Sequence, residues 1–226
     1  MRTFILRHDN SISHEYAKIT AESCDKHNMN WEYFEGFSGI KGSDALKSCG
    51  INVLKETKAP INSSKNKGQL CTASHVAMWK KIIDNKIHEA VILEHDAIMI
   101  KPFNAMLPEN TIVALGYKIN NPHNYDPPDE ITCCYRKIEG IQGSHAYAIT
   151  YKTAQRLYDG VVKRKTAGCI DSHVMQKNTF RNGVNMMITD PIVSLGWLRD
   201  STIWNRTARD TSIKIESFEK NYHETS

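Results

Sequence analysis

The sequence lacks the features that are typical of three classes of protein: membrane-spanning proteins, zinc knuckles and nucleic-acid binders. No apolar run approaches the ~18 residues of a membrane span, and the apolar segment Thr3–Leu6 ends at Arg7, too early for a signal-peptide core. None of the six cysteines stands in a Cys-x-x-Cys pair, which argues against a zinc knuckle. No dense Lys/Arg run interleaved with aromatic residues is present, so we expect no nucleic-acid partner.

Charge and cysteine content fit an intracellular enzyme. The chain has 29 basic and 25 acidic residues, a mild excess that is compatible with an anionic substrate. Without a signal core, we expect the cysteines to be reduced thiols in a cytoplasmic protein. Peripheral contact with the inner face of a membrane is compatible with this composition, and nothing in the sequence specifies the oligomeric state.

Strand-like apolar runs alternate with segments of helical period, which predicts a single α/β domain over residues 1–200 and a polar tail over residues 201–226. The clearest predicted helix is Thr72–Asn85, and the continuous apolar run Ala90–Leu93 is typical of a strand covered on both faces. Residues 40–68 are predicted to be irregular, and residues 116–130 to form a long functional loop. Further strands are predicted at 3–6, 31–34, 112–115, 131–136, 146–150 and 186–189, and further helices at 14–27, 153–163 and 171–180.

Two acids follow the apolar run, in the triplet Glu94-His95-Asp96. In open α/β sheets, ligands bind at the carboxyl ends of the strands. If the strand stays extended, the alternation of side chains sends Glu94 and Asp96 to the same side. Such a pair of carboxylates favours a hard cation, Mn²⁺ or Mg²⁺, which can bridge a diphosphate and neutralise a leaving group. The alternative is that the triplet merely begins a polar turn.

Three motifs in order along the chain resemble glycosyltransferase family 25, the bacterial lipopolysaccharide and lipooligosaccharide sugar transferases with their collagen galactosyltransferase relatives. Gly68–Ile82 resembles the family's Ser-His helix, Ala90–Asp96 its apolar strand and acidic triplet, and Gly143–Ile149 its Gly-Thr-His-Ala-Tyr strand. Thr153–Leu157 is similar to its next helix, and the whole resemblance runs from about residue 3 to 205. His95 departs from the family, which usually has Asp at this position.

The resemblance implies a GT-A-like (Rossmann-like) α/β fold, in which a mixed, mostly parallel sheet carries helices on both faces. It also implies a nucleotide-diphosphate donor such as UDP-galactose or UDP-glucose, a glycan or glycolipid acceptor, and inversion at the anomeric carbon. An inverting transfer needs a general base for the acceptor hydroxyl. Asp171 matches an acidic position of the family and is the predicted base, with a plain helix N-cap as the alternative.

Four residues are predicted to bind the donor: Arg7, His8, Ser74 and His145. Arg7 and His8 follow the first strand, and an arginine there can pair with phosphate, although a solvated loop charge is the simpler interpretation. His145 either completes the metal shell of Glu94 and Asp96 or is a half-buried strand histidine bonded to backbone. His75 is interpreted as structural, with Ser74 as the donor contact.

Two other functions remain open from the sequence. A non-catalytic nucleotide-sugar or glycan binder is conceivable because His95 replaces an acid. A nucleotidyltransferase would use the same pair of acids and a metal-bound phosphate, but no glycine-rich phosphate loop follows the first strand. The donor sugar, the acceptor and the linkage are not specified by the residues.

Overall fold

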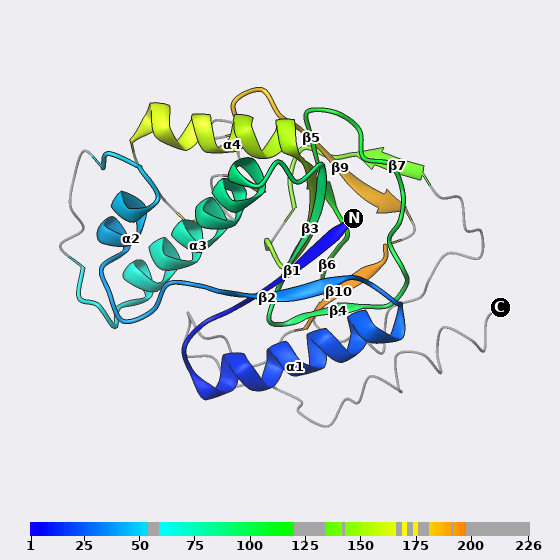
Figure 1. The fold of residues 1–226 in the computed structure, drawn as a ribbon, viewed down its shortest axis with the longest axis horizontal. Helices are drawn as coiled ribbons and strands as arrows, with labels where there is room; N and C mark the ends of the chain where they lie inside the picture. Colours follow the sequence, from blue (N-terminus) through cyan, green and yellow to red (C-terminus); the bar gives the residue numbers. More distant parts are fainter. Residues whose placement is uncertain are drawn as a thin grey trace.

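A seven-stranded mixed sheet forms the centre of the protein, with the strand order β2-β1-β3-β8-β5-β9-β7 (Figure 1). This computed structural model describes residues 1–53, 59–119, 134–141, 143–165, 169–170, 174–175, 181–190 and 192–197. The strands of the sheet are β1 (Arg2–Arg7), β2 (Trp31–Glu35), β3 (Glu89–Glu94), β5 (Thr111–Ala114), β7 (Cys134–Lys137), β8 (Ala146–Thr150) and β9 (Asn185–Asp190). All run in one direction except β8 and β7, which confirms the predicted mixed, mostly parallel sheet.

Helices cover both faces of this sheet, as predicted (Figure 1). Helix α1 (Ser11–Lys26) lies on one face, whereas α2 (Gly42–Ser48), α3 (Ser64–Asp84) and α4 (Tyr151–Arg164) lie on the other. Successive strand residues alternate between the two cores, so Ile92 packs with α3 and α4 while its neighbours Val91 and Leu93 pack with α1. This double coverage explains the uninterrupted apolar run in β3.

The interpretation of residues 40–68 as irregular is wrong in two places. Residues Gly42–Ser48 form α2, and α3 begins at Ser64, well before the predicted start at Thr72. Ser63 caps α3, because its hydroxyl accepts a hydrogen bond from the Asn66 backbone at 3.3 Å. Glycine and asparagine have low intrinsic helix propensity, so tertiary contacts account for these helical turns. The N-cap residue of α2 makes no side-chain cap, but the Gly42 amide donates to Oδ1 of Asn66 at 2.8 Å, and both helices pack apolar residues into the core.

A small second sheet has the order β4-β10-β6 and comprises β4 (Ala97–Met99), β6 (Gly116–Ile119) and β10 (Ser194–Trp197). The first four residues of the predicted 116–130 loop therefore form a strand, and 120–130 lie outside the described residues. Glycine is required at position 116, because an added Cβ would lie 1.6 Å from the carbonyl oxygen of Ser194. No described helix is long and apolar enough to cross a membrane. The predicted tail 201–226 also lies outside the described residues.

Candidate active site at the carboxyl edge of β1 and β3

The sheet topology brings residues from three distant parts of the chain to one edge. Strands β1 and β3 are parallel neighbours, with Leu6 opposite Glu94, so the residues that follow both strands meet there. Strand β8 is antiparallel to β3, so the residues that precede β8, Ser144 and His145, reach the same edge. The backbone amide of Glu94 donates to the carbonyl of His145 at 2.7 Å. Two of the predicted metal ligands are therefore neighbours.

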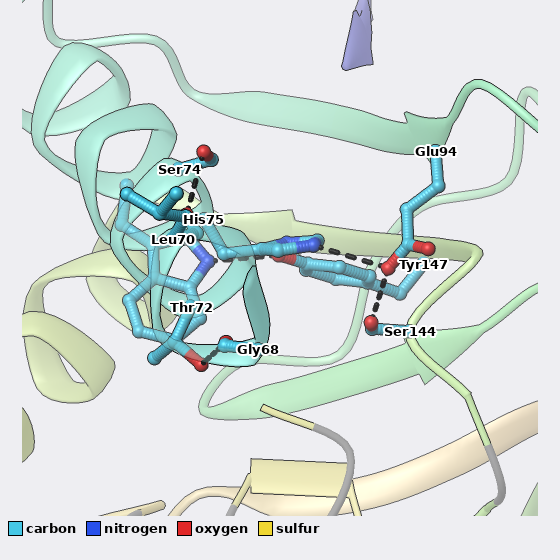
Figure 2. Close-up of polar contacts among 9 residues, drawn as sticks. Gly68, Leu70, Thr72, Ser74, His75, Glu94, Ser144 and Tyr147 are labelled. Carbon is cyan, nitrogen blue, oxygen red and sulfur yellow. Dashed lines mark hydrogen bonds and ion pairs between the residues drawn. The ribbon is translucent and has the colours of Figure 1, made fainter. Parts of the chain in front are cut away.

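Glu94 is held at this edge by two side chains (Figure 2). Its Oε1 lies 3.2 Å from Nε2 of His75, and the hydroxyl of Ser144 donates to the same oxygen. Glu94 continues the alternation of Ile92 and so faces α3, which carries His75. The side chain of Glu94 is 15% exposed, so the carboxylate is anchored from the protein side and still reaches solvent.

His75 is part of a buried hydrogen-bond chain (Figure 2). Its Nδ1 lies 2.8 Å from the hydroxyl of Tyr147, which also accepts a hydrogen bond from Nε1 of Trp79 at 2.9 Å. Burial raises the pKa of Tyr147 well above its ordinary value, so the hydroxyl stays protonated. The structural interpretation of His75 missed its contact with Glu94, and Tyr147 and Ser144 were not singled out, although both belong to the Gly143–Ile149 motif.

The interpretation of Glu94-His95-Asp96 as an extended segment is wrong. Strand β3 ends at Glu94, and His95 and Asp96 form a turn that leads into β4. The alternation of side chains therefore does not place the two carboxylates on one side. The ring of His95 is buried, stacked on Tyr16 with the ring centroids 6.1 Å apart. Asp96 is half-buried in the turn.

His8 lies close to His95 and Glu94. The rings of His8 and His95 meet edge to face at 6.2 Å. Burial, assisted by His95 and opposed by Glu94, lowers the pKa of His8 from 6.5 to about 4, so His8 is neutral at pH 7. Gly36 makes room for this ring, because an added Cβ there would lie 2.8 Å from the imidazole.

Two predicted donor ligands have protein partners of their own. The guanidinium of Arg7 forms an ion pair with Glu35 and lies 3.9 Å above the ring of Tyr33. Ser74 is completely buried, and its hydroxyl accepts a hydrogen bond from the backbone of Phe37 and donates one to the carbonyl of Leu70. The position of Ser74 does not support a contact with the donor.

The predicted base Asp171 lies outside the described residues. His145 is buried and lies just before β8, so the interpretation as a half-buried histidine within the strand is wrong, while its role as a metal or phosphate ligand stays a prediction. Its backbone contact with Glu94 nevertheless keeps it at the site.

Within the described parts of the chain, one group of three potential metal ligands has its atoms within 4.8 Å of one another, namely Cys71, His75 and Glu94. Asp96 and His145 are not members of this group. Thiol and imidazole are soft or borderline ligands, which suit Zn²⁺ better than the hard cations expected on a diphosphate. The arrangement therefore differs from the predicted ligand set of Glu94, Asp96 and His145.

Residues 11–129, which make up more than half of the chain, match the model of glycosyltransferase family 25 (LPS biosynthesis protein). The chain belongs to glycosyltransferase family 25. It is therefore an enzyme of the transferase class, and the family agrees with the GT-A-like α/β fold that the motifs predicted. No curated protein matches the sequence.

Several solved glycosyltransferases are similar over nearly the whole chain. The galactosyltransferase LgtC, solved with donor and acceptor sugar analogues, is 12% identical, with a TM-score of 0.49 and coverage of 99% of this chain and 96% of LgtC. A glycosyltransferase involved in glycosylation of the major capsid of PBCV-1 is 10% identical, with a TM-score of 0.43 and 98% coverage of both chains. GlyE of Streptococcus pneumoniae TIGR4 is 11% identical, with a TM-score of 0.45 and coverage of 99% of this chain and 59% of GlyE.

Proposed function

We propose that the protein transfers a hexose, galactose or glucose, from a nucleotide-diphosphate sugar to a glycan or lipooligosaccharide-type acceptor with inversion at the anomeric carbon. The observation that carries the proposal is the partly exposed carboxylate of Glu94, anchored at the carboxyl edge of β3 by His75 and Ser144. Ligands bind at this edge in open α/β sheets. Membership of the family supports the class of reaction, and the position of Glu94 supports this edge as the proposed active site.

The residues at this edge suit a divalent cation by their chemistry. Glu94 and Asp96 are both half-buried carboxylates, and the backbone of His145 is hydrogen-bonded to that of Glu94, which keeps a third potential ligand at this edge. Carboxylate oxygens with one imidazole are compatible with Mn²⁺ and, less well, with Mg²⁺. When bound, such a cation neutralises charge on the departing nucleoside diphosphate. Glu94 and Asp96 are the proposed ligands, and His145 is either a third ligand or a contact to phosphate.

Neutral His8 is the proposed donor contact at the end of β1. A neutral imidazole can accept or donate one hydrogen bond to a phosphate or ribose without adding charge. Arg7 would have to leave Glu35 to reach a phosphate, so we rank it below His8. Asp171 remains the proposed base that removes the proton of the acceptor hydroxyl.

The experiment is a screen of UDP-, GDP- and CMP-sugars for Mn²⁺-dependent thermal stabilisation, followed by assays of donor hydrolysis and transfer. Glu94→Gln, which keeps the size of the side chain but removes its charge, should lose both stabilisation and turnover. Asp84→Asn is the matched control, since Asp84 pairs with Lys80 at the far end of α3. Full turnover by folded Glu94→Gln would refute the proposal.

The burial of His95 favours one alternative function, namely binding of a nucleotide sugar without transferase activity. The family usually has an acid at this position, whereas here the ring is packed against Tyr16. Mn²⁺-dependent binding of a nucleotide sugar with neither hydrolysis nor transfer to any glycan would identify the binder.

A further inference from the structure

The hydrogen-bond chain that ends on Glu94 begins deep in the core. Trp79, Tyr147 and His75 are at most 1% exposed. The contacts follow one another without a break: Trp79 Nε1 to the Tyr147 hydroxyl at 2.9 Å, that hydroxyl to His75 Nδ1 at 2.8 Å, and His75 Nε2 to Glu94 Oε1 at 3.2 Å. In Figure 2 a dashed line joins the imidazole of His75 to the carboxylate of Glu94.

The first member of the chain determines its direction. The indole nitrogen of Trp79 can only donate, so the Tyr147 oxygen accepts there. Among the described residues the hydroxyl of Tyr147 has one other partner, Nδ1 of His75, and its hydrogen must therefore point to that nitrogen. Nδ1 is then the acceptor, and Nε2 carries the imidazole hydrogen and donates it to Glu94.

The opposite tautomer is unfavourable at both ends of the imidazole. With the hydrogen on Nδ1, the oxygen of Tyr147 would receive two N–H groups. Its own buried hydrogen would then have no acceptor in the part of the chain that the structure describes, at a cost of about 1–3 kcal/mol. At the other end, a lone pair on Nε2 would face a carboxylate oxygen at 3.2 Å. Either defect alone disfavours this state, so the direction does not depend on a single contact.

We propose that Trp79, Tyr147 and His75 form a one-way chain of hydrogen-bond donors that positions the Glu94 carboxylate for cation binding. Tyr147 and His75 are thus positioning residues that act through Glu94. The cation part of this inference rests on the proposed function, whereas the direction of the chain does not.

The same direction excludes Cys71, His75 and Glu94 as a resident metal site, although their ligand atoms lie within 4.8 Å. A protonated Nε2 has no lone pair to give to a metal, and moving its hydrogen to Nδ1 would leave the buried hydroxyl of Tyr147 without an acceptor. Hydrogen bonding explains the close approach of His75 and Glu94.

Nitrogen-15 NMR of histidine-labelled protein tests the direction, with the His75 signals assigned by their loss in His75→Gln. We expect a protonated Nε2 and an unprotonated Nδ1. Tyr147→Phe removes the donor to Nδ1 and should shift the ring toward a mixture of tautomers. Wild-type protein with the hydrogen on Nδ1 would overturn the chain.

Calorimetric titration with Mn²⁺, with and without UDP, tests positioning. Mutation of a residue that supports a metal ligand by hydrogen bonding typically lowers metal affinity about 10- to 100-fold. Tyr147→Phe should therefore weaken Mn²⁺ binding by about tenfold. The matched control is Tyr158→Phe, which removes a different tyrosine hydroxyl. That hydroxyl donates to the carbonyl of Cys49 and is not part of the chain that ends on Glu94. The Mn²⁺ affinity of Tyr158→Phe should equal that of the wild type.

Equal Mn²⁺ affinities for the folded Tyr147→Phe and Tyr158→Phe variants would overturn the positioning role. If Tyr147→Phe does not fold, His75→Gln and His75→Met decide the question, because the Gln amide can still donate to Glu94 and the thioether cannot. We expect His75→Gln to bind Mn²⁺ about tenfold more tightly than His75→Met does. Wild-type protein that binds no Mn²⁺ would refute the cation part together with the proposed function, while the NMR result would still decide the direction of the chain.

Discussion

Acidification should destabilise the protein through His8. The folded state holds this imidazole neutral, because burial and the neighbouring His95 lower its pKa from 6.5 to about 4. In the unfolded chain the same imidazole takes up a proton near its ordinary pKa. Between these two pKa values the unfolded state binds more protons, so the free energy of unfolding falls as the pH falls. Above pH 6.5 neutral His8 makes its full contribution to the free energy of unfolding, and this contribution is lost progressively as the pH falls to about 4.

The size of the effect follows from the difference between the two pKa values. Each pKa unit corresponds to about 1.4 kcal/mol, so a shift from 6.5 to about 4 amounts to roughly 3 kcal/mol over the full range. Between pH 7.5 and pH 4.5 most of this range is crossed, and we expect a loss of about 2–3 kcal/mol from His8 alone.

Urea denaturation of the wild type and of His8→Gln at these two pH values isolates the contribution. The other titrating groups are present in both proteins, so the effects of those that do not interact with His8 cancel in the difference. The wild type should lose about 2–3 kcal/mol more than the variant on acidification. Equal losses in the two proteins, or an NMR titration that places the pKa of His8 near 6.5, would refute the argument.

Three further predictions concern packing and thiol chemistry. Gly116→Ala should destabilise the protein by about 3 kcal/mol in urea denaturation, because its Cβ would overlap the carbonyl oxygen of Ser194 and break the pairing of β6 with β10. Gly68→Ala should instead stabilise it by about 0.5–1 kcal/mol, since the Cβ meets nothing within 4 Å and alanine favours helix α3; a destabilised variant would contradict this. Burial raises the pKa of Cys24 to about 12 and that of Cys49 to about 11, so both thiols should react with Ellman's reagent only after unfolding.

Local patterns were sufficient for most of the elements. Strand β8 and helices α1 and α4 were predicted within a few residues of their observed bounds, because alternation and helical period are properties of neighbouring residues. The course of the chain after β3 was not predicted correctly. His95 and Asp96 form a turn because the next strand, β4, pairs with β10, which lies about a hundred residues later in the chain.

By itself, the sequence determined the α/β class, the family and the position of Glu94 at the end of a buried strand, since all three depend on ordered motifs and local periodicity. Only the tertiary structure decided what surrounds that carboxylate. His75 lies 19 residues before Glu94 and Ser144 lies 50 residues after it. The antiparallel placement of β8 beside β3 brings Ser144 to the carboxylate, and the packing of α3 on the sheet brings His75. Hydrogen bonds of this kind depend on how strands are ordered in the sheet, which no local pattern records.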